Sequence, residues 1–195
     1  MGTGLIILGA VAFIALVKII VIVSLRNGIV SAKNRVKRAW ADVLAYQRKK
    51  LNVIPALEQG LKDHQAYERG VFKDITALRA SAERLSDDKV DIGQLQDVDR
   101  RSKMLLSSLN VAVEAYPALK TSELYAGWMR ELAEAEENIA AAIVIFNSTV
   151  QGFNDNIQEF PGNLVNSWFN RERPLDTFTD GKAQGGFEYQ PTFKS

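Results

Sequence analysis

The side chains that most often carry out chemistry are scarce in this sequence. His64 is the only histidine and cysteine is absent, so a Ser-His-Asp triad, a cluster of histidines around a metal, thiolate catalysis and disulfides all lack necessary residues. No glycine-rich phosphate loop or serine nucleophile elbow occurs either. We interpret His64 as a surface or bundle-edge residue and expect a protein that is not an enzyme, with no catalytic residue, cofactor or metal.

The densest group of carboxylates consists of Glu131, Glu134, Glu136 and Glu137. Three of them recur at every third position along one side of a predicted helix, but no Glu-x-x-His motif accompanies them as in di-iron bundles. We expect a solvated helix face, or a partner for the basic run at residues 48–50.

One apolar run dominates the N-terminal part of the chain. Residues 5–25 read LIILGAVAFIALVKIIVIVSL, and a helix of this length spans about 30 Å at about 1.5 Å per residue. The four residues before it lack the basic leader of a removable signal peptide, so we expect a retained transmembrane anchor. Lys18 interrupts the run. Its stem either extends towards the cytoplasmic headgroups or faces other anchors around a polar seam in an oligomer.

Basic residues follow the apolar run immediately, whereas none precedes it. The membrane-proximal set is Arg26, Lys33, Arg35, Lys37 and Arg38. This asymmetry predicts a single-pass protein of the cytoplasmic membrane, with its N-terminus outside and the remainder in the cytoplasm.

The charge is unevenly distributed along the chain. Residues 26–50 hold eight Lys or Arg against one acidic residue, a net charge of +7, whereas residues 51–195 carry a net charge of −7. The basic part suits the anionic lipids of an inner leaflet. We expect no nucleic-acid partner, because Trp40 and Tyr46 are the only aromatic residues in the basic segment and the segment is tethered at a membrane.

Apolar residues recur at threes and fours over most of residues 26–160, which predicts helices. The sequence around Pro55 is LNVIPALEQG, which has no cluster of loop-forming residues. A kink in a continuous helix therefore fits better than a hairpin. We place the first break at residues 86–93, after an apolar series that continues to Leu85. A second helix follows over residues 95–116, and Thr121 is expected to cap the last one.

The last helix has the clearest pattern. From Tyr125 to Phe160, apolar residues recur at intervals of three or four positions. Two successive intervals of four positions around Ile139 resemble a coiled-coil stutter. The predicted structural core includes Trp40, Phe146, Val150, Phe153, Ile157 and Phe160. A core role for Trp40 is favoured over stacking on a ligand.

These elements predict an all-α protein: a single N-terminal transmembrane helix followed by an elongated antiparallel bundle of three to four long helices. We expect an anchor at residues 1–25, a cytoplasmic bundle at residues 26–170 and a flexible C-terminal tail at residues 171–195. The segment FEYQPTF at residues 187–193 is either part of a mobile tail or an extended peptide that docks on a partner.

Four segments carry a family likeness. They read SLRNGIVSAKNRVKRAWADV, VIPALEQGLKDHQAYE, AYPALK and AEENIAAAIVIFNSTVQGFNDNIQEFPGNLV, and the most specific part is FN-x2-V-x2-FN-x2-I-x2-FP at residues 146–161. Together they resemble the LemA family of bacterial membrane-anchored proteins over most of residues 24–165. The resemblance implies an N-out, C-in anchor with a cytoplasmic helical bundle, and one branch of the family is associated with shaping magnetosome membranes. Asn52, Val53 and Ala56 depart from the family's usual residues around its Leu-Ile-Pro, so partner specificity is not carried over.

We expect a non-enzymatic membrane scaffold or membrane-shaping protein that forms a homo-oligomer. The alternative is an adaptor or accessory subunit of a membrane protease or transporter complex, which would contact that membrane protein through the C-terminal tail. Polar residues beside a helical seam either pair subunits or bond within one chain, and basic residues can pair with acidic faces of other copies. The candidates for self-association are Lys18, Arg48, Lys49, Lys50, Asn147 and Asn154.

Overall fold

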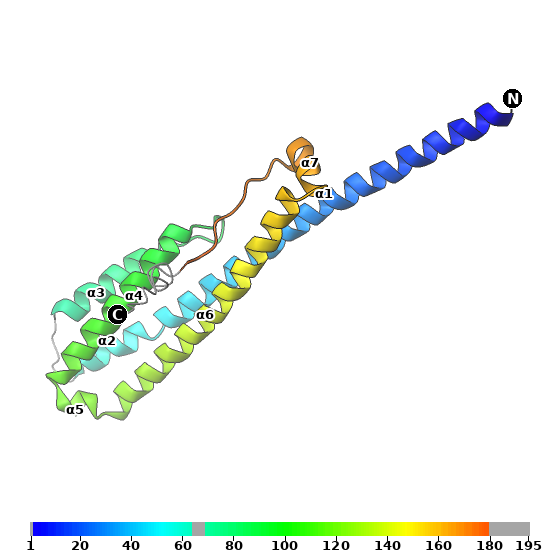
Figure 1. Cartoon of the computed structure of the whole chain (residues 1–195). Coiled ribbons are helices and arrows are strands. Elements are labelled where there is room, and N and C mark those ends of the chain that lie inside the picture. Colours follow the sequence, from blue (N-terminus) through cyan, green and yellow to red (C-terminus); the bar gives the residue numbers. More distant parts are fainter. Residues whose placement is uncertain (1, 64–68, 180–195) are drawn as a thin grey trace, which may run out of the picture. The chain divides into compact units, whose positions relative to one another are not determined.

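The computed structural model describes residues 2–63 and 69–179, without the side chain of Leu5. Every regular element among them is a helix, so the all-α prediction is confirmed (Figure 1). The elements are α1 (Gly2–Leu51), α2 (Ile54–Asp63), α3 (Arg69–Ala82), α4 (Ile92–Glu114), α5 (Pro117–Lys120), α6 (Glu123–Gln158), α7 (Gly162–Val165) and the π-helix η1 (Asn166–Asn170). The described residues divide into two compact units, one within residues 2–38 and 147–176 and the other within residues 39–146 and 177–179.

The first part of α1 is long enough and apolar enough to cross a membrane, and no other described helix has both properties. None of its most apolar eighteen-residue stretch is buried within the chain. Apolar surface without a covering is costly in water.

A two-residue break at Asn52 and Val53 separates α1 from α2. The N–H of Asn52 still donates to the carbonyl of Arg48 (3.2 Å), and the carbonyl of Val53 accepts from Leu57 (3.1 Å). Pro55 lies in the first turn of α2, where its missing N–H leaves the ladder of helical hydrogen bonds incomplete. The structure therefore has an interruption here and no hairpin.

The chain reverses after α2, which the sequence pattern did not predict. Arg79 Nη2 of α3 lies 2.9 Å from Glu58 Oε2 of α2. In one continuous helix these residues would lie about 31 Å apart, so the expectation of a helical stretch through Leu85 without a turn is wrong. His64 lies outside the described residues.

Capping residues set the ends of α4 and α6. The side chain of Asp91 accepts a hydrogen bond from Gln94 N–H (2.9 Å) at the start of α4. Ser122, and not Thr121, caps α6, because Ser122 Oγ accepts from Tyr125 N–H (3.2 Å). Thr121 instead closes the short helix α5 that begins at Pro117.

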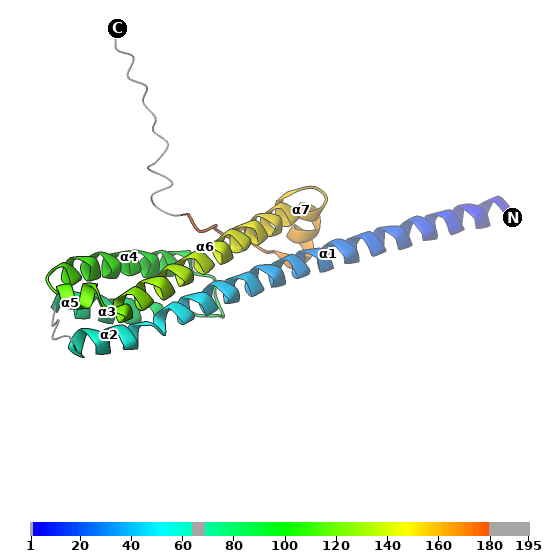
Figure 2. The same cartoon turned by 90° about the horizontal axis from the view of Figure 1, so that it is seen from below.

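The core of the unit formed by residues 39–146 lies among α2, α3, α4, α5 and α6 (Figure 2). Trp128 of α6 packs directly against the backbone of α2 at Gly60. A Cβ at Gly60 would lie 2.0 Å from Trp128 Cη2, so only glycine leaves space for the indole. The fully buried leucines and isoleucines of this core are Ile54, Leu57, Leu61, Ile75, Leu78, Leu109 and Leu119.

In the other unit, the part of α1 that follows the apolar run, up to Arg38, packs against the part of α6 that begins at Asn147. Its buried residues are Ile29, Ala32, Val36, Val150, Phe153, Ile157 and Val165. Phe160 was predicted to belong to the core, but 77% of it is exposed. The reason is that α6 ends at Gln158, so the helical spacing no longer determines where the side chain of Phe160 points.

The pair of four-residue spacings in α6 lies further along than predicted. Ala142 is buried instead of Ile143. The two successive intervals of four residues between buried positions therefore lie on either side of Phe146. The smaller side chain at position 142 takes the inward position and Ile143 is only half-buried.

The predicted flexible tail does not begin at residue 171. Lys33 Nζ lies 2.7 Å from Glu172 Oε1, and the backbone of Leu175 bonds to a side chain of α6. In the other unit Phe178 is buried, and the carbonyl of Thr179 accepts from Gln96 Nε2 (3.2 Å). Residues 171–179 therefore pack on the helices, and the rest of the predicted tail, with FEYQPTF, lies outside the described residues.

Candidate functional site

The predicted membrane-proximal cations do not behave as one set. Arg26, Lys37 and Arg38 are exposed and form no ion pair with a described residue, and Arg35 bonds only to Ser31 Oγ (3.2 Å). Lys33 is half-buried and its ammonium pairs with both carboxylate oxygens of Glu172, each at 2.7 Å. These internal bonds neutralise its charge, so Lys33 is not a free cation for lipid headgroups.

The basic run at the end of α1 pairs within its own chain. Arg48 Nη2 lies 3.0 Å from Asp87 Oδ1, and Lys49 Nζ lies 3.4 Å from Glu134 Oε1. Lys50 Nζ lies 3.0 Å from Glu136 Oε1.

Lys50 is the most enclosed of these cations, with 1% of the residue exposed. Glu134 and Glu136 are thus internal partners of the basic run, whereas Glu131 and Glu137 lie on the exposed face of the helix, so each of the two expected outcomes holds for part of the group. Lys50 is enclosed within its own chain, whereas Arg48 and Lys49 have side chains that are 60% and 61% exposed, so their contact with other copies stays a prediction.

The two asparagines of α6 differ in what the structure shows of them. Asn154 accepts from Leu175 N–H through Oδ1 and donates to Leu175 O through Nδ2, both at 2.9 Å. Its amide therefore holds an extended segment of the same chain, which is the alternative of bonding within one chain. Asn147 is half-buried and also has an interaction partner.

Trp40 is a core residue. Only 1% of it is exposed, and its Nε1–H donates to the carbonyl of Ser86 (2.9 Å). Its ring centroid lies 5.6 Å from that of Phe146. Because the residue is almost fully buried and its polar atom has a partner, no surface remains for stacking on a ligand.

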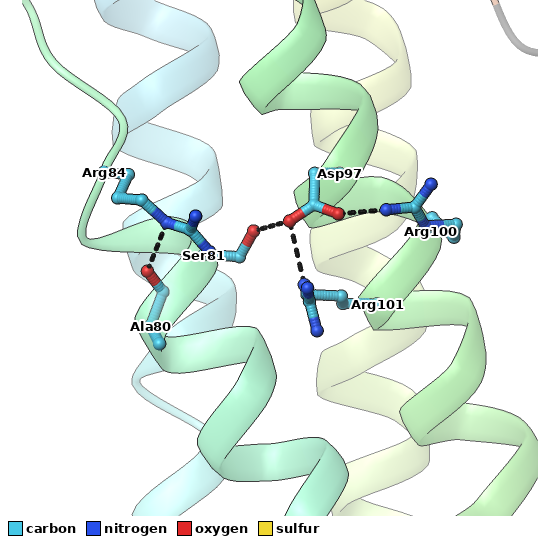
Figure 3. Close-up of polar contacts among 6 residues, drawn as sticks. All are labelled: Ala80, Ser81, Arg84, Asp97, Arg100 and Arg101. Carbon is cyan, nitrogen blue, oxygen red and sulfur yellow. Dashed lines mark hydrogen bonds and ion pairs between the residues drawn. The ribbon is translucent and has the colours of Figure 1, made fainter.

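The most perturbed carboxylate is Asp97, which joins α3 to α4 (Figure 3). It accepts hydrogen bonds from the Ser81 hydroxyl and from the guanidinium groups of Arg101 (2.8 Å) and Arg100. These bonds, above all that from Ser81, lower the pKa of Asp97 to about 2. A general base works best when its pKa lies near the operating pH, so this carboxylate is poorly suited to proton transfer and instead holds two helices together.

Metal-binding geometry is also missing from the described part of the chain. No group of three or more His, Cys, Asp or Glu side chains is placed to hold an ion there. Of the α6 glutamates, Glu134 and Glu136 are engaged with lysines, and Glu131 and Glu137 are exposed.

An apolar groove of about 290 Å³ lies between the end of the apolar run in α1 and the segment that follows α6. The α1 wall includes Val17, Lys18, Val21 and Leu25. The opposite wall is formed by Phe160, Pro161, Leu164, Val165, Trp168 and Phe169. The spacing of apolar residues did not predict this surface, although a cluster of aromatic residues directly after a core helix was a signal for it.

Comparison with known proteins settles the family. A family model described as the LemA family matches residues 39–185, well over half of the chain. The chain belongs to the LemA family. A curated relative, Protein LemA of Metamycoplasma hominis, is 26% identical to this LemA-family chain over 147 residues, 74% of the chain. That match covers 65% of the relative, so the chain spans just under two thirds of the relative's length.

Proposed function

We propose that this LemA-family chain is a non-enzymatic scaffold of the bacterial cytoplasmic membrane. Residues 5–25 anchor it with the N-terminus outside, and the helical bundle lies in the cytoplasm. The observation that carries the proposal is the exposed apolar part of α1, none of which is buried in the chain. A bilayer is the medium that covers twenty consecutive, almost entirely apolar residues of a helix.

Anionic lipid headgroups are the proposed partners of the free cations on α1. Arg26 lies next to the apolar run, and Arg35, Lys37 and Arg38 follow it along the helix. A cation near an anionic surface contributes about 1 kcal/mol, and the attraction fades beyond a Debye length of about 8 Å. Arg26 therefore contributes most, and Arg38, about 18 Å further along a helix perpendicular to the surface, contributes least.

Lateral association is supported by apolar side chains that the bundle leaves exposed. Val144 and Ile145 of α6 are 68% and 59% exposed, and Val111 of α4 is 68% exposed. Anchoring in one membrane raises the effective concentration of neighbouring copies, so even weak contacts between such surfaces favour assembly. We propose these residues as the main contact between copies.

Light scattering of the full chain in mild detergent tests association. We expect oligomers that dissociate when Val144 and Ile145 are both replaced by serine. The control is Leu124→Ser, which alters a leucine of the same helix that is 55% exposed and lies about 30 Å away. A protein that remains monomeric at every concentration contradicts the scaffold and favours the adaptor function.

Protease accessibility tests the location. Protease added to intact spheroplasts should spare the bundle, and protease added to inverted vesicles should digest it. The opposite pattern would overturn the proposed orientation.

A further inference from the structure

Four large apolar side chains lie close together after the end of α6. Phe160 is 77% exposed, Leu164 50%, Trp168 70% and Phe169 51%. Single exposed apolar residues are common on protein surfaces, but a contiguous apolar patch marks a surface that something else covers.

This patch is continuous with the apolar part of α1. The groove described above has the patch as one wall and Val17, Val21, Ile22 and Leu25 as the other. Figures 1 and 2 both show α7 beside α1. From Val17 to Leu25 is about 12 Å along a helix, most of the roughly 15 Å of hydrocarbon in one leaflet. Whatever medium surrounds that stretch of α1 also meets the patch.

Asn166 and Ser167 provide internal hydrogen bonds to the backbone of this segment. Asn166 satisfies the backbone of Glu172, accepting from its N–H (2.9 Å) and donating to its carbonyl (3.0 Å), and Ser167 Oγ donates to the carbonyl of Leu164 (2.8 Å). Backbone groups with internal partners can enter an apolar medium at little cost. Two exposed cations, Arg171 and Arg173, follow the aromatic residues directly. Aromatic residues beside basic ones are typical of the boundary between acyl chains and headgroups.

From these observations we propose that residues 160–169 form a second membrane contact. The four apolar side chains enter the leaflet that surrounds the end of the α1 span, and an acyl chain of a membrane phospholipid fills the groove between them. Arg171 meets the phosphates of that leaflet, whereas Lys18, which lines the groove, lies about 10 Å before Leu25 along the helix and only extends its side chain towards them. The inference rests on the proposed anchoring by residues 5–25. A phospholipid is the occupant because the groove walls are continuous with the surface that the bilayer would cover.

Three leucines of nearly equal exposure allow a matched test. Leu16 lies in the apolar part of α1 (55% exposed), Leu164 in the patch (50%) and Leu124 in the other unit (55%). The chain has no cysteine, so Leu16→Cys, Leu164→Cys and Leu124→Cys each carry a single thiol. The full-length variants are labelled with an environment-sensitive fluorophore and reconstituted into vesicles of phosphatidylcholine and phosphatidylglycerol with brominated acyl chains.

We expect the bromines to quench the labels at positions 16 and 164 strongly and the label at 124 hardly at all. Quenching at 16 with none at 164 overturns the second contact and leaves the anchor intact. No quenching at 16 overturns the anchor and with it this inference, and equal quenching at 164 and 124 shows adhesion that is not specific to the patch, which also overturns it.

The native chromophore provides a second measurement without a label. Trp168 is 70% exposed, so Trp168→Phe should leave the fold intact. Subtracting the emission of this variant from that of the wild type gives the emission of Trp168. We expect brominated lipid to quench this Trp168 emission. A difference spectrum that brominated lipid leaves unchanged contradicts the insertion of Trp168.

Discussion

Lys50 of α1 and Glu136 of α6 form an ion pair in which the lysine side chain is only 2% exposed and the glutamate 35%. Ser102 of α4 donates its hydroxyl to the same carboxylate oxygen at 3.2 Å, so this contact joins three helices of one unit. A buried ammonium is stable only with a counter-charge, because its desolvation costs several kcal/mol. The pair therefore specifies which helices meet.

Removing the counter-charge should destabilise the bundle. We expect Glu136→Gln to lower the free energy of unfolding by about 3 kcal/mol, because the charge of Lys50 is left buried without a partner. The matched control is Glu134→Gln, which breaks the exposed Lys49–Glu134 pair (61% and 64% exposed) and should cost about 0 to 1 kcal/mol. Denaturant unfolding of the full chain in detergent, followed by circular dichroism, measures both. Equal effects of the two changes would show that water reaches the ammonium of Lys50.

Asp97 should make stability depend on pH in the acid range. Its folded pKa is lowered from 3.8 to about 2, so the ionised form is favoured by folding. The stabilisation is therefore fully present above pH 3.8 and is lost as the pH falls towards 2. We expect Asp97→Asn to cost up to about 2 kcal/mol at neutral pH, since one pKa unit corresponds to about 1.4 kcal/mol.

Unfolding of the wild type and Asp97→Asn at several pH values checks this dependence. The difference between the two proteins isolates Asp97 from the other carboxyl groups. A difference that stays constant from neutral pH to pH 2 would contradict the role of the Ser81 and arginine bonds.

Two phenylalanines of the same sequence motif should respond oppositely to truncation. Phe153 is 1% exposed, so Phe153→Ala should cost about 3 to 5 kcal/mol through lost burial and the cavity it leaves. Phe160 is 77% exposed, and Phe160→Ala should change stability in detergent by less than about 0.5 kcal/mol. Thermal unfolding compares them, and similar losses would place Phe160 in the core after all.

The amide of Asn154 should determine whether residues 171–176 stay packed. Asn154→Ala removes both hydrogen bonds to Leu175 and should cost about 1 to 3 kcal/mol. We expect faster tryptic cleavage after Arg171. Asn156→Ala is the control, because among the described residues the Asn156 side chain bonds only to the carbonyl of Gly152 on its own helix. If the control is cleaved equally fast, the clamp does not hold the segment.

Local pattern was sufficient for most of the helical structure. The spacing of apolar residues predicted that four side chains of the last helix face the core. All four are buried: Phe146, Val150, Phe153 and Ile157. A helix repeats every 3.6 residues whatever it packs against, so its buried face can be recognised from sequence alone. The length and composition of residues 5–25 likewise identify a helix that could span a membrane, since both are properties of one segment.

Contacts between distant residues were decided only by the tertiary structure. Nothing in the sequence shows that the chain reverses after Asp63, and that reversal places Arg79 beside Glu58. The sequence offered a group of four glutamates as partners for residues 48–50. Which of them meets Lys50 depends on distances of a few ångströms between helices, and only the tertiary structure shows that it is Glu136. Phe160 is exposed because the helix ends before it, and beyond a helix end the direction of a side chain depends on the packing around it.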